Sequence, residues 1–218
     1  MDVWSDIACP WCYIGRRRFA LGVEQYAATD GARPVQVTYH SFELSPDTPV
    51  DYEGSSTDFL ASHRGIPIED ARAMNAQVAQ LAQAVDLTFD ADATHHTNTR
   101  RMHEVLHLAR ERDVQDAVVG RLLRAYWGEG RDLRHDDELA DLAAEAGLDR
   151  TEVLEALADR RYSAAVDGDV AQAAAYGIRG VPFYVLDHRY GISGAQDPAV
   201  FARALTRAAA DRAATPTP

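Results

Sequence analysis

Short segments with alternating apolar and polar residues lie near both ends of the chain. Residues Asp2 to Ile7 alternate with a period of two, and Pro34 to Phe42 adds β-branched residues to the same period, so both predict strands. Near the other end, residues 182–186 and 189–193 predict two short strands joined by a tight turn at Asp187-His188. The two ends therefore supply the strands of the expected fold.

Helical spacing dominates the rest of the sequence. A helix is expected from Pro10 toward Tyr26, because proline suits the first helical position, where a backbone N–H would lack a partner anyway. Between about Thr57 and Tyr176 the chain is rich in Ala, Leu and Arg and predicts five to seven helices. Breaks are expected at Gly65-Ile66-Pro67, Asp90 to Thr94, Asp113, Gly128-Glu129-Gly130 and Gly147. A last helix from Asp197-Pro198 to about Arg212 completes an α/β layer that is interrupted by an all-helical insertion.

Two structural units are expected rather than one. The length of 218 residues exceeds one ordinary domain of about 100 to 150 residues. The change in composition predicts a discontinuous α/β domain of residues 1–56 and 165–212, with a helical insertion domain of residues 57–164. Residues 213–218 are expected to form a disordered tail.

Composition and charge exclude several classes of function. With 46% apolar and 26% charged residues, the chain has the make-up of a globular protein. The net charge of -12 disfavours nucleic acids and anionic membranes as partners. All 22 basic residues are arginine, which excludes a Schiff-base lysine and a phosphate-loop lysine. The first residues contain no basic leader or long apolar run, so the expected location is the cytoplasm.

The motif Cys9-Pro10-Trp11-Cys12 is the strongest chemical signal. Cys9 ends the first strand at the expected start of a helix, where the helix dipole stabilises a thiolate. Cys12 lies one helical turn later on the same face, where its sulfur can reach Cys9. We therefore expect a redox pair in which Cys9 attacks and Cys12, more buried and less acidic, resolves.

Two other interpretations of the cysteines stay open from local features. Cys9 and Cys12 can be inert packed thiols, or they can form half of a zinc site. The second interpretation needs histidines from far along the chain, because the sequence contains no other cysteine. In a reducing compartment, such a pair is more often catalytic or metal-binding than structural.

Three blocks of sequence resemble the DsbA-like family, and specifically its cytosolic FrnE-type branch. The first block surrounds the cysteines, from Ser5 to Gly15, and a shorter second block runs from Ser41 to Pro46. The third runs from Gly177 to Val185 and continues from Tyr190 to Gln196. The resemblance implies a thioredoxin fold interrupted by a large helical insertion, and it spans nearly the whole chain.

The resemblance also implies roles for individual residues. It implies that Cys9 attacks, that Cys12 resolves, and that the Val181–Pro182 peptide bond is cis and faces the cysteines. Without the family match, Pro182 would be expected to follow an ordinary trans bond, because only about 5 to 6% of such bonds are cis. If the bond is cis, as the resemblance implies, the backbone N–H and carbonyl of Val181 face outward and can pair with an extended substrate segment, as an added strand does.

The expected reaction is thiol–disulfide exchange with a protein or a small molecule that carries a thiol or a disulfide. It requires no metal or organic cofactor, and glutathione is a candidate co-substrate. A related branch, the hydroxychromene-carboxylate isomerases, binds glutathione and has serine in place of Cys9. The alternative function is therefore a glutathione-dependent isomerase or transferase acting on an aromatic or polyketide-like molecule, and a third is a non-catalytic binding module.

A second motif, His103-Glu104-Val105-Leu106-His107, matches the zinc-protease pattern of two histidines one helical turn apart. The extended form of that pattern has glycine and histidine where this chain has Arg110 and Asp113. We therefore expect no metal here. Instead, His103 and His107 are expected to line the groove between the helical insertion and the core, together with Asn98 and Thr99.

Overall fold

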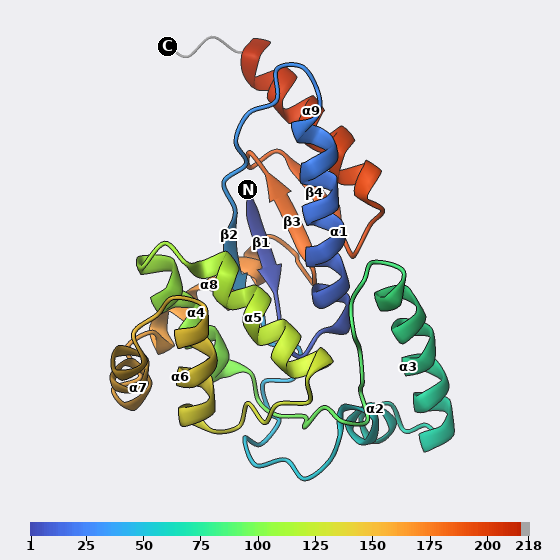
Figure 1. Cartoon of the computed structure of the whole chain (residues 1–218), viewed down its shortest axis with the longest axis vertical. Coiled ribbons are helices and arrows are strands. Elements are labelled where there is room, and N and C mark those ends of the chain that lie inside the picture. Colours follow the sequence, from blue (N-terminus) through green and yellow to red (C-terminus); the bar gives the residue numbers. More distant parts are fainter. Residues whose placement is uncertain (215–218) are drawn as a thin grey trace.

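The computed structural model describes residues 1–214, and its centre is one mixed sheet of four strands (Figure 1). The strands are β1 (Asp2–Ser5), β2 (Thr38–Ser41), β3 (Phe183–Leu186) and β4 (Tyr190–Ser193), in the spatial order β2-β1-β3-β4. Strand β1 is parallel to β2 and antiparallel to β3, and β3 is antiparallel to β4. Segments from the two ends of the chain thus share one sheet, as predicted.

Strand β2 is shorter than the sequence predicts, because its partner strand is short. Thr38 pairs with Asp2, and the Thr38 N–H donates to the carbonyl of Met1, so residues 34–37 have no strand beside them. The turn between β3 and β4 lies where it was expected, at Asp187 and His188, whose φ angles are 48° and 55°. Two successive positive φ angles form the tight turn that matches the twist of a hairpin.

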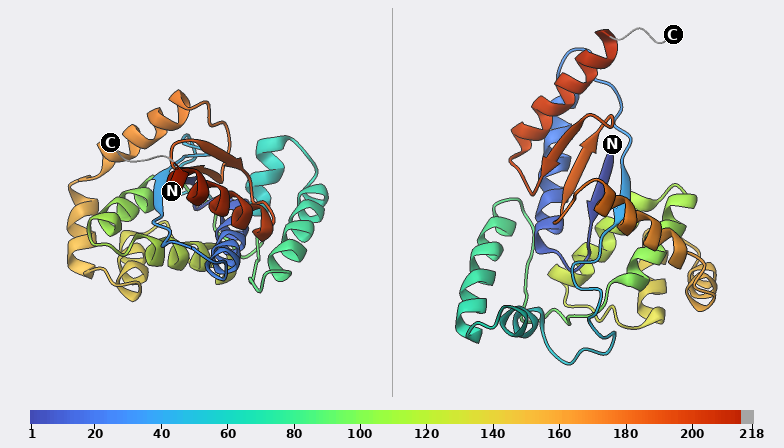
Figure 2. Two further views of the ribbon diagram at one scale, coloured as in Figure 1. Left: turned by 90° about the horizontal axis from the view of Figure 1, so that it is seen from above. Right: turned by 180° about the vertical axis from the view of Figure 1, so that it is seen from behind.

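Helices cover both faces of the sheet (Figures 1 and 2). On one face lie α1 (Pro10–Ala27) and α9 (Pro198–Ala214), where Phe201 is 4.8 Å from the ring centre of Tyr184 on β3. On the other face, Trp4 packs with Ala173 of α8 (Ser163–Ala175), and its indole N–H donates to the Asp169 carbonyl at 3.3 Å. The alternation of Val3 and Trp4 along β1 therefore serves two separate clusters of the core.

Seven helices, all within the described range, lie between β2 and β3 in the chain. Besides α8 they are α2 (Ser56–Arg64), α3 (Ile68–Gln83), α4 (Arg100–Glu111), α5 (Gln115–Gly128), α6 (Asp136–Glu145) and α7 (Arg150–Ala158). Helices α2 and α3 lie apart from α4 to α8 (Figure 1), and α3 packs on Ile14 of α1 through Val78 and Ala82. The predicted boundary after residue 164 falls inside α8, and the division into two domains stays a prediction.

Two details of the helical region differ from the sequence analysis. The break between α7 and α8 was missed, because it is a left-handed turn at Arg160 (φ 54°), where no glycine or proline marks it. Helix α9 continues to Ala214, two residues past the predicted end at Arg212, and residues 215–218 of the predicted tail lie outside the described residues. Throughout the described residues, no helix is both long and apolar enough to cross a membrane.

Candidate functional site

The two cysteines lie where β1 leads into α1. Cys9 is the N-cap of α1 with an extended backbone (φ -97°, ψ 112°), and Pro10 is the first helical residue. Both cysteines are free thiols, and they are 3% and 2% exposed. Burial alone therefore hardly separates Cys9 from Cys12, although the sequence analysis expected Cys12 to be the more buried. Their contacts separate them instead.

Cys9 faces the segment that leads into β3. Its thiol donates a hydrogen bond to the backbone carbonyl of Val181 at 3.4 Å, across 172 positions of sequence. The peptide bond between Val181 and Pro182 is cis, and the Pro182 carbonyl accepts a hydrogen bond from the Gly194 N–H at 2.8 Å. The structure thus brings together Cys9, Val181 and Pro182, which the family resemblance assigns to one site.

Cys12 is enclosed by the start of the core. The Asp6 backbone N–H donates to the Cys12 sulfur at 3.5 Å. Burial raises the pKa of the Cys12 thiol well above its ordinary value, and the hydrogen bond and charge of the Cys9 sulfur raise it further. A thiol with a raised pKa stays protonated and attacks slowly, so Cys12 suits the second step of an exchange rather than the first.

The first turns of α1 lie very close to the segment at Pro182. A Cβ atom at Gly15 would lie 2.7 Å from the Tyr184 hydroxyl and 2.8 Å from Cγ of Pro182. Only glycine allows this approach. On the outer side of the same helix start, Trp11 is 41% exposed and presents an aromatic surface beside the cysteines.

A buried carboxylate lies beneath the cysteines. Asp6 is 1% exposed and accepts hydrogen bonds from the backbone N–H of Leu44 at 2.7 Å and of Ala8 at 3.2 Å. Burial alone would raise the pKa of Asp6, but the contact with His103 and the hydrogen bonds from Leu44 and Thr99 outweigh it and lower the pKa. The sequence analysis placed Asp6 on a strand face and did not identify it as part of the site. The available signal was a charged residue three positions before Cys9.

The two histidines of the protease-like motif face different carboxylates. His103 Nε2 lies 3.4 Å from Asp6 Oδ1, whereas His107 Nε2 lies 3.2 Å from Asp169 Oδ2. Glu104, between them, is paired with Arg160 at 2.9 Å. Among the residues described, no group of three or more His, Cys, Asp or Glu side chains is arranged to hold a metal ion. The two histidines of the motif therefore face separate partners rather than one shared position.

The expectation that four residues line an open groove needs correction. Thr99, His103 and His107 are 5%, 1% and 8% exposed, so their side chains lie in the interior between α4 and the sheet. Half-buried Asn98 donates from its side chain to the Pro46 carbonyl at 2.9 Å and supports the loop after β2. These side chains reach the cysteines only through Asp6 and the loop, and their predicted role in orienting a substrate stays a prediction.

A second polar cluster fastens the insertion to the sheet. The Asp169 carboxylate of α8 accepts hydrogen bonds from His40 Nδ1 at 2.8 Å and from the Ser41 N–H at 2.8 Å, and it also contacts His107 of α4. Burial would raise the pKa of Asp169, but the hydrogen bonds with His107 and His40 outweigh it and lower the pKa. For His40 the balance is opposite: burial would lower its pKa, but the bonds to Asp169 and Asp2 raise it.

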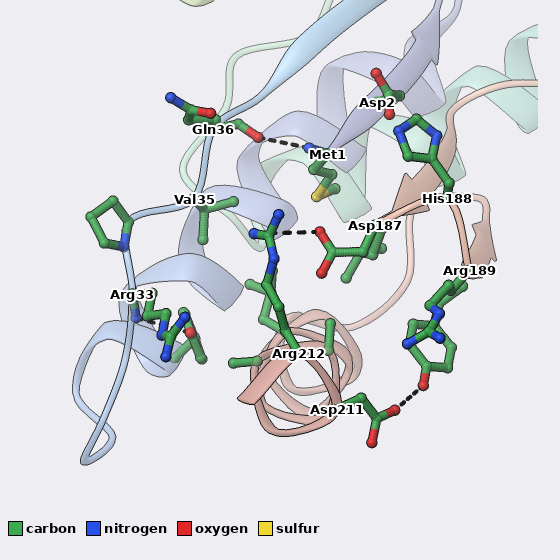
Figure 3. Close-up of a pocket in the computed structure, with 17 residues that line it drawn as sticks. Met1, Asp2, Arg33, Val35, Gln36, Asp187, His188, Arg189, Asp211 and Arg212 are labelled. Atoms are coloured by element: carbon green, nitrogen blue, oxygen red, sulfur yellow. Dashed lines mark hydrogen bonds and ion pairs between the residues drawn. The ribbon is translucent and has the colours of Figure 1, made fainter. Parts of the chain in front are cut away.

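A cavity of about 720 Å³ lies at the far end of the sheet from the cysteines (Figure 3). Its walls come from the start of β1, the loop at 33–36, the β3–β4 turn and the end of α9. Several of its polar groups already pair with one another: Arg212 lies 4.0 Å from Asp187, and the Tyr190 hydroxyl donates to Asp211. Because β1 runs from this cavity toward Cys9, the cavity is separate from the cysteine site.

Comparison with known proteins places the chain in a family. The model of the DSBA-like thioredoxin domain matches residues 1–206. The crystal structure of SCO1869 from Streptomyces coelicolor, a probable DsbA oxidoreductase, is 38% identical, with a TM-score of 0.90 over 100% of this chain and 92% of that chain.

Two more distant structures share the fold. A 2-hydroxychromene-2-carboxylate isomerase is 18% identical, with a TM-score of 0.73 over 99% of this chain and 98% of that one. The cytosolic disulfide reductase DsbM from Pseudomonas aeruginosa, solved with GSH, is 19% identical, with a TM-score of 0.59 over 98% of this chain and 96% of that one. Together with the cysteines at the start of α1, the match over residues 1–206 shows that the chain belongs to the DSBA-like thioredoxin domain family, whose fold carries a helical insertion here.

Proposed function

We propose that the protein is a thiol–disulfide oxidoreductase whose redox pair is Cys9 and Cys12. The observation that carries the proposal is the different surroundings of the two sulfurs. The Cys9 sulfur lies at the start of α1 against the Val181 backbone, where the helix dipole favours a thiolate. The pKa of Cys12 is raised, so this thiol stays protonated until a mixed disulfide has formed at Cys9, when it gives up its proton and attacks the Cys9 sulfur.

The exchange balances with these two residues alone. The Cys9 thiolate attacks one sulfur of a substrate disulfide, the substrate S–S bond breaks, and one substrate thiolate leaves and takes up a proton. Cys12 then loses its proton and attacks the Cys9 sulfur, which forms the Cys9–Cys12 disulfide and releases the second substrate thiol. Two electrons pass from the protein to the substrate, and the same steps in reverse oxidise a substrate dithiol.

Backbone groups beside Cys9 supply a place for the substrate chain. Val181 is half-buried, and its carbonyl accepts a hydrogen bond from the Cys9 thiol in the reduced protein. An extended segment that carries the reacting sulfur would pair with this backbone as an added strand. The named activity of DsbM, a cytosolic disulfide reductase solved with GSH, supports a cytoplasmic location and glutathione as a co-substrate within this proposal.

A redox titration tests the proposal directly. The protein is equilibrated in glutathione buffers of graded potential, its free thiols are trapped by alkylation, and the modified cysteines are counted by mass. Because the chain contains only two cysteines, each mass step is assigned without ambiguity. We expect one reversible two-electron transition between dithiol and disulfide. A pair that stays reduced at every potential would contradict the proposal and favour the glutathione-dependent isomerase or transferase.

Two variants separate the roles of the sulfurs. Cys9→Ser should abolish reduction of a disulfide substrate while the far-ultraviolet circular dichroism stays that of the wild type. Cys12→Ser should accumulate a mixed disulfide at Cys9, visible as an added mass that a reductant removes. Disulfide reductase activity retained by Cys9→Ser would contradict the assignment of Cys9 as the attacking residue.

A further inference from the structure

A groove of about 380 Å³ opens between the loop after β2 and helix α2. Its lining is apolar and aromatic apart from a few polar groups, and includes Leu44, Pro46, Pro49, Tyr52, Phe59 and His63. Leu44 is 42% exposed, and Val50 on the same loop is 44% exposed. Large apolar side chains are thus left open to solvent on one short stretch of chain, which is typical of a surface that binds something.

Two hydrogen bonds connect this groove to the cysteines. The backbone N–H of Leu44 donates to the Asp6 carboxylate at 2.7 Å, and the Asp6 N–H donates to the Cys12 sulfur at 3.5 Å. Trp11, between the two cysteines, adds a second exposed aromatic surface. These hydrogen bonds place the groove on the same side of the molecule as the cysteines, where an extended substrate chain that reacts at Cys9 can pass over it.

The aromatic floor of the groove is held in place from below. The Phe59 ring stacks on His96, with centroids 3.6 Å apart, and on His63 at 5.1 Å, and it meets the Tyr52 ring edge to face at 5.7 Å. The Thr97 hydroxyl donates to the Val50 carbonyl at 2.8 Å, and Asn98 holds the carbonyl of Pro46. Binding to a surface that is already ordered costs little conformational entropy.

The loop along one side of the groove is acidic. Residues 44 to 63 contain four carboxylates and no arginine, in a protein that has no lysine. Asp47 lines the groove, Asp51 and Glu53 follow it on the same loop, and Asp58 caps α2 through Ser55. In the part of the chain that the structure describes, no cation lies within 4.0 Å of Asp47, Asp51 or Glu53.

One arginine whose charge acts on this loop is already engaged. Arg134 lies close enough to Asp51 and Glu53 for their charges to act on it, but its guanidinium is paired with Asp132 at 2.6 Å. Carboxylates that have no cationic partner beside an apolar groove attract a positively charged segment through their net charge. Glutathione, with two carboxylates and one ammonium group, would be repelled here.

We infer that this groove binds a basic segment of a protein substrate, with the apolar side chains of the segment against the groove lining and its arginine or lysine side chains beside the carboxylates of the loop. The inference rests on the proposed function, because it assigns the groove to the substrate that exchanges with Cys9. It adds the chemical class of the protein substrate: a cationic polypeptide chain.

Three peptide disulfides test the inference with the wild-type protein. Each is a disulfide-linked dimer of one short peptide, with arginine, glutamine or glutamate a few positions from the cysteine. The reduced protein reacts in a single turnover, giving two peptide thiols and one Cys9–Cys12 disulfide, and the released thiol is followed by chromatography after an acid quench. We expect the arginine peptide to react about tenfold faster than the glutamate peptide at low ionic strength, with glutamine between them. The ratio should shrink as salt is added.

A matched pair of triple variants locates the effect. Asp47→Asn, Asp51→Asn and Glu53→Gln together should remove most of the preference for the arginine peptide and change the rate with the glutamine peptide less than about twofold. The control makes the same chemical changes at exposed residues outside the groove, Asp30→Asn, Asp113→Asn and Glu155→Gln, and should keep the preference.

The outcomes distinguish the two proposals. Equal rates with all three peptides, or a preference that the control variant loses as fully as the groove variant, would overturn the inference and leave the proposed function standing. Failure to reduce any of the three peptides would overturn the proposed function, and the inference with it.

Discussion

Replacing Gly15 by alanine tests how closely α1 must pack on the segment that faces the cysteines. The new Cβ would lie 2.7 Å from the Tyr184 hydroxyl and 2.8 Å from Cγ of Pro182, whereas carbon atoms in good contact lie about 3.5 to 4.0 Å apart. Tyr184 is 1% exposed and Pro182 is buried, so neither can move aside into solvent. The backbone at Pro182 must therefore shift, and the Val181 carbonyl moves with it, away from Cys9.

The size of the effect follows from two opposing terms. Overpacking a well-filled core costs about 1 to 3 kcal/mol, and two contacts below 3.0 Å with buried atoms place Gly15→Ala at the upper end of that range. Alanine returns about 1 kcal/mol through its higher helix propensity. We expect the free energy of unfolding to fall by about 2 kcal/mol, and we expect slower reduction of an uncharged disulfide by the variant.

Gly168 of α8 provides the matched control. A Cβ atom there would meet nothing within 4 Å, so Gly168→Ala keeps the propensity gain alone and should raise the free energy of unfolding by up to about 1 kcal/mol. Urea unfolding followed by circular dichroism measures both variants. A Gly15→Ala protein as stable as the wild type, next to a control that behaves as expected, would refute the packing argument.

Three further predictions address single residues. Asp169→Asn should lower the free energy of unfolding by about 3 to 5 kcal/mol, because it removes the buried negative charge that pairs with His40 and accepts the Ser41 N–H. Asp167→Asn in the same helix, where the side chain is 66% exposed, should cost less than about 1 kcal/mol, and similar midpoints in urea for the two variants would contradict this. His96→Gln should make stability less sensitive to acid: the pKa of buried His96 is lowered to about 4, mainly by burial, so the unfolded chain binds a proton below about pH 6.5 that the folded protein does not. The free energy of unfolding of the wild type should therefore fall by about 2 kcal/mol more than that of the variant between pH 8 and pH 5. Equal dependence of the two free energies on pH, measured by urea titration, would disprove this prediction. Cys12 in the Cys9→Ser variant should react with iodoacetamide about tenfold more slowly at pH 8 than Cys9 in the Cys12→Ser variant, because the pKa of Cys12 is raised by burial; mass spectrometry over time would show equal rates if the asymmetry is absent.

Local patterns in the sequence were sufficient for most of the elements and for the placement of the cysteines. The alternation around Val3 and the proline after Cys9 depend only on near neighbours, and so does the placement of both sulfurs on the first turn of a helix. The family resemblance supplied Val181 and Pro182, which local patterns alone would have left as an ordinary entry into a strand.

The surroundings of the cysteines were beyond sequence reasoning for a physical reason. Asp6 accepts a hydrogen bond from the Leu44 N–H in the loop after β2 and contacts His103 of α4. Both contacts depend on how the insertion lies across the sheet. The spacing of His103 and His107 predicted one shared face, and that is correct for the helix. Which carboxylate each ring meets is decided by the path of α4 over β1 and α8, and periodicity carries no information about that path.

The contact between Cys9 and Val181 also has a consequence during synthesis of the protein on the ribosome. The two residues are 172 positions apart. At about 5 to 20 residues per second, both sulfurs wait roughly 9 to 34 s after their own synthesis before the segment that covers Cys9 has been made. During that interval the thiols belong to an unfinished chain in which the segment at Val181 does not yet cover Cys9. The oxidation state of the compartment in which translation takes place therefore acts on this pair before the pair can act on anything else.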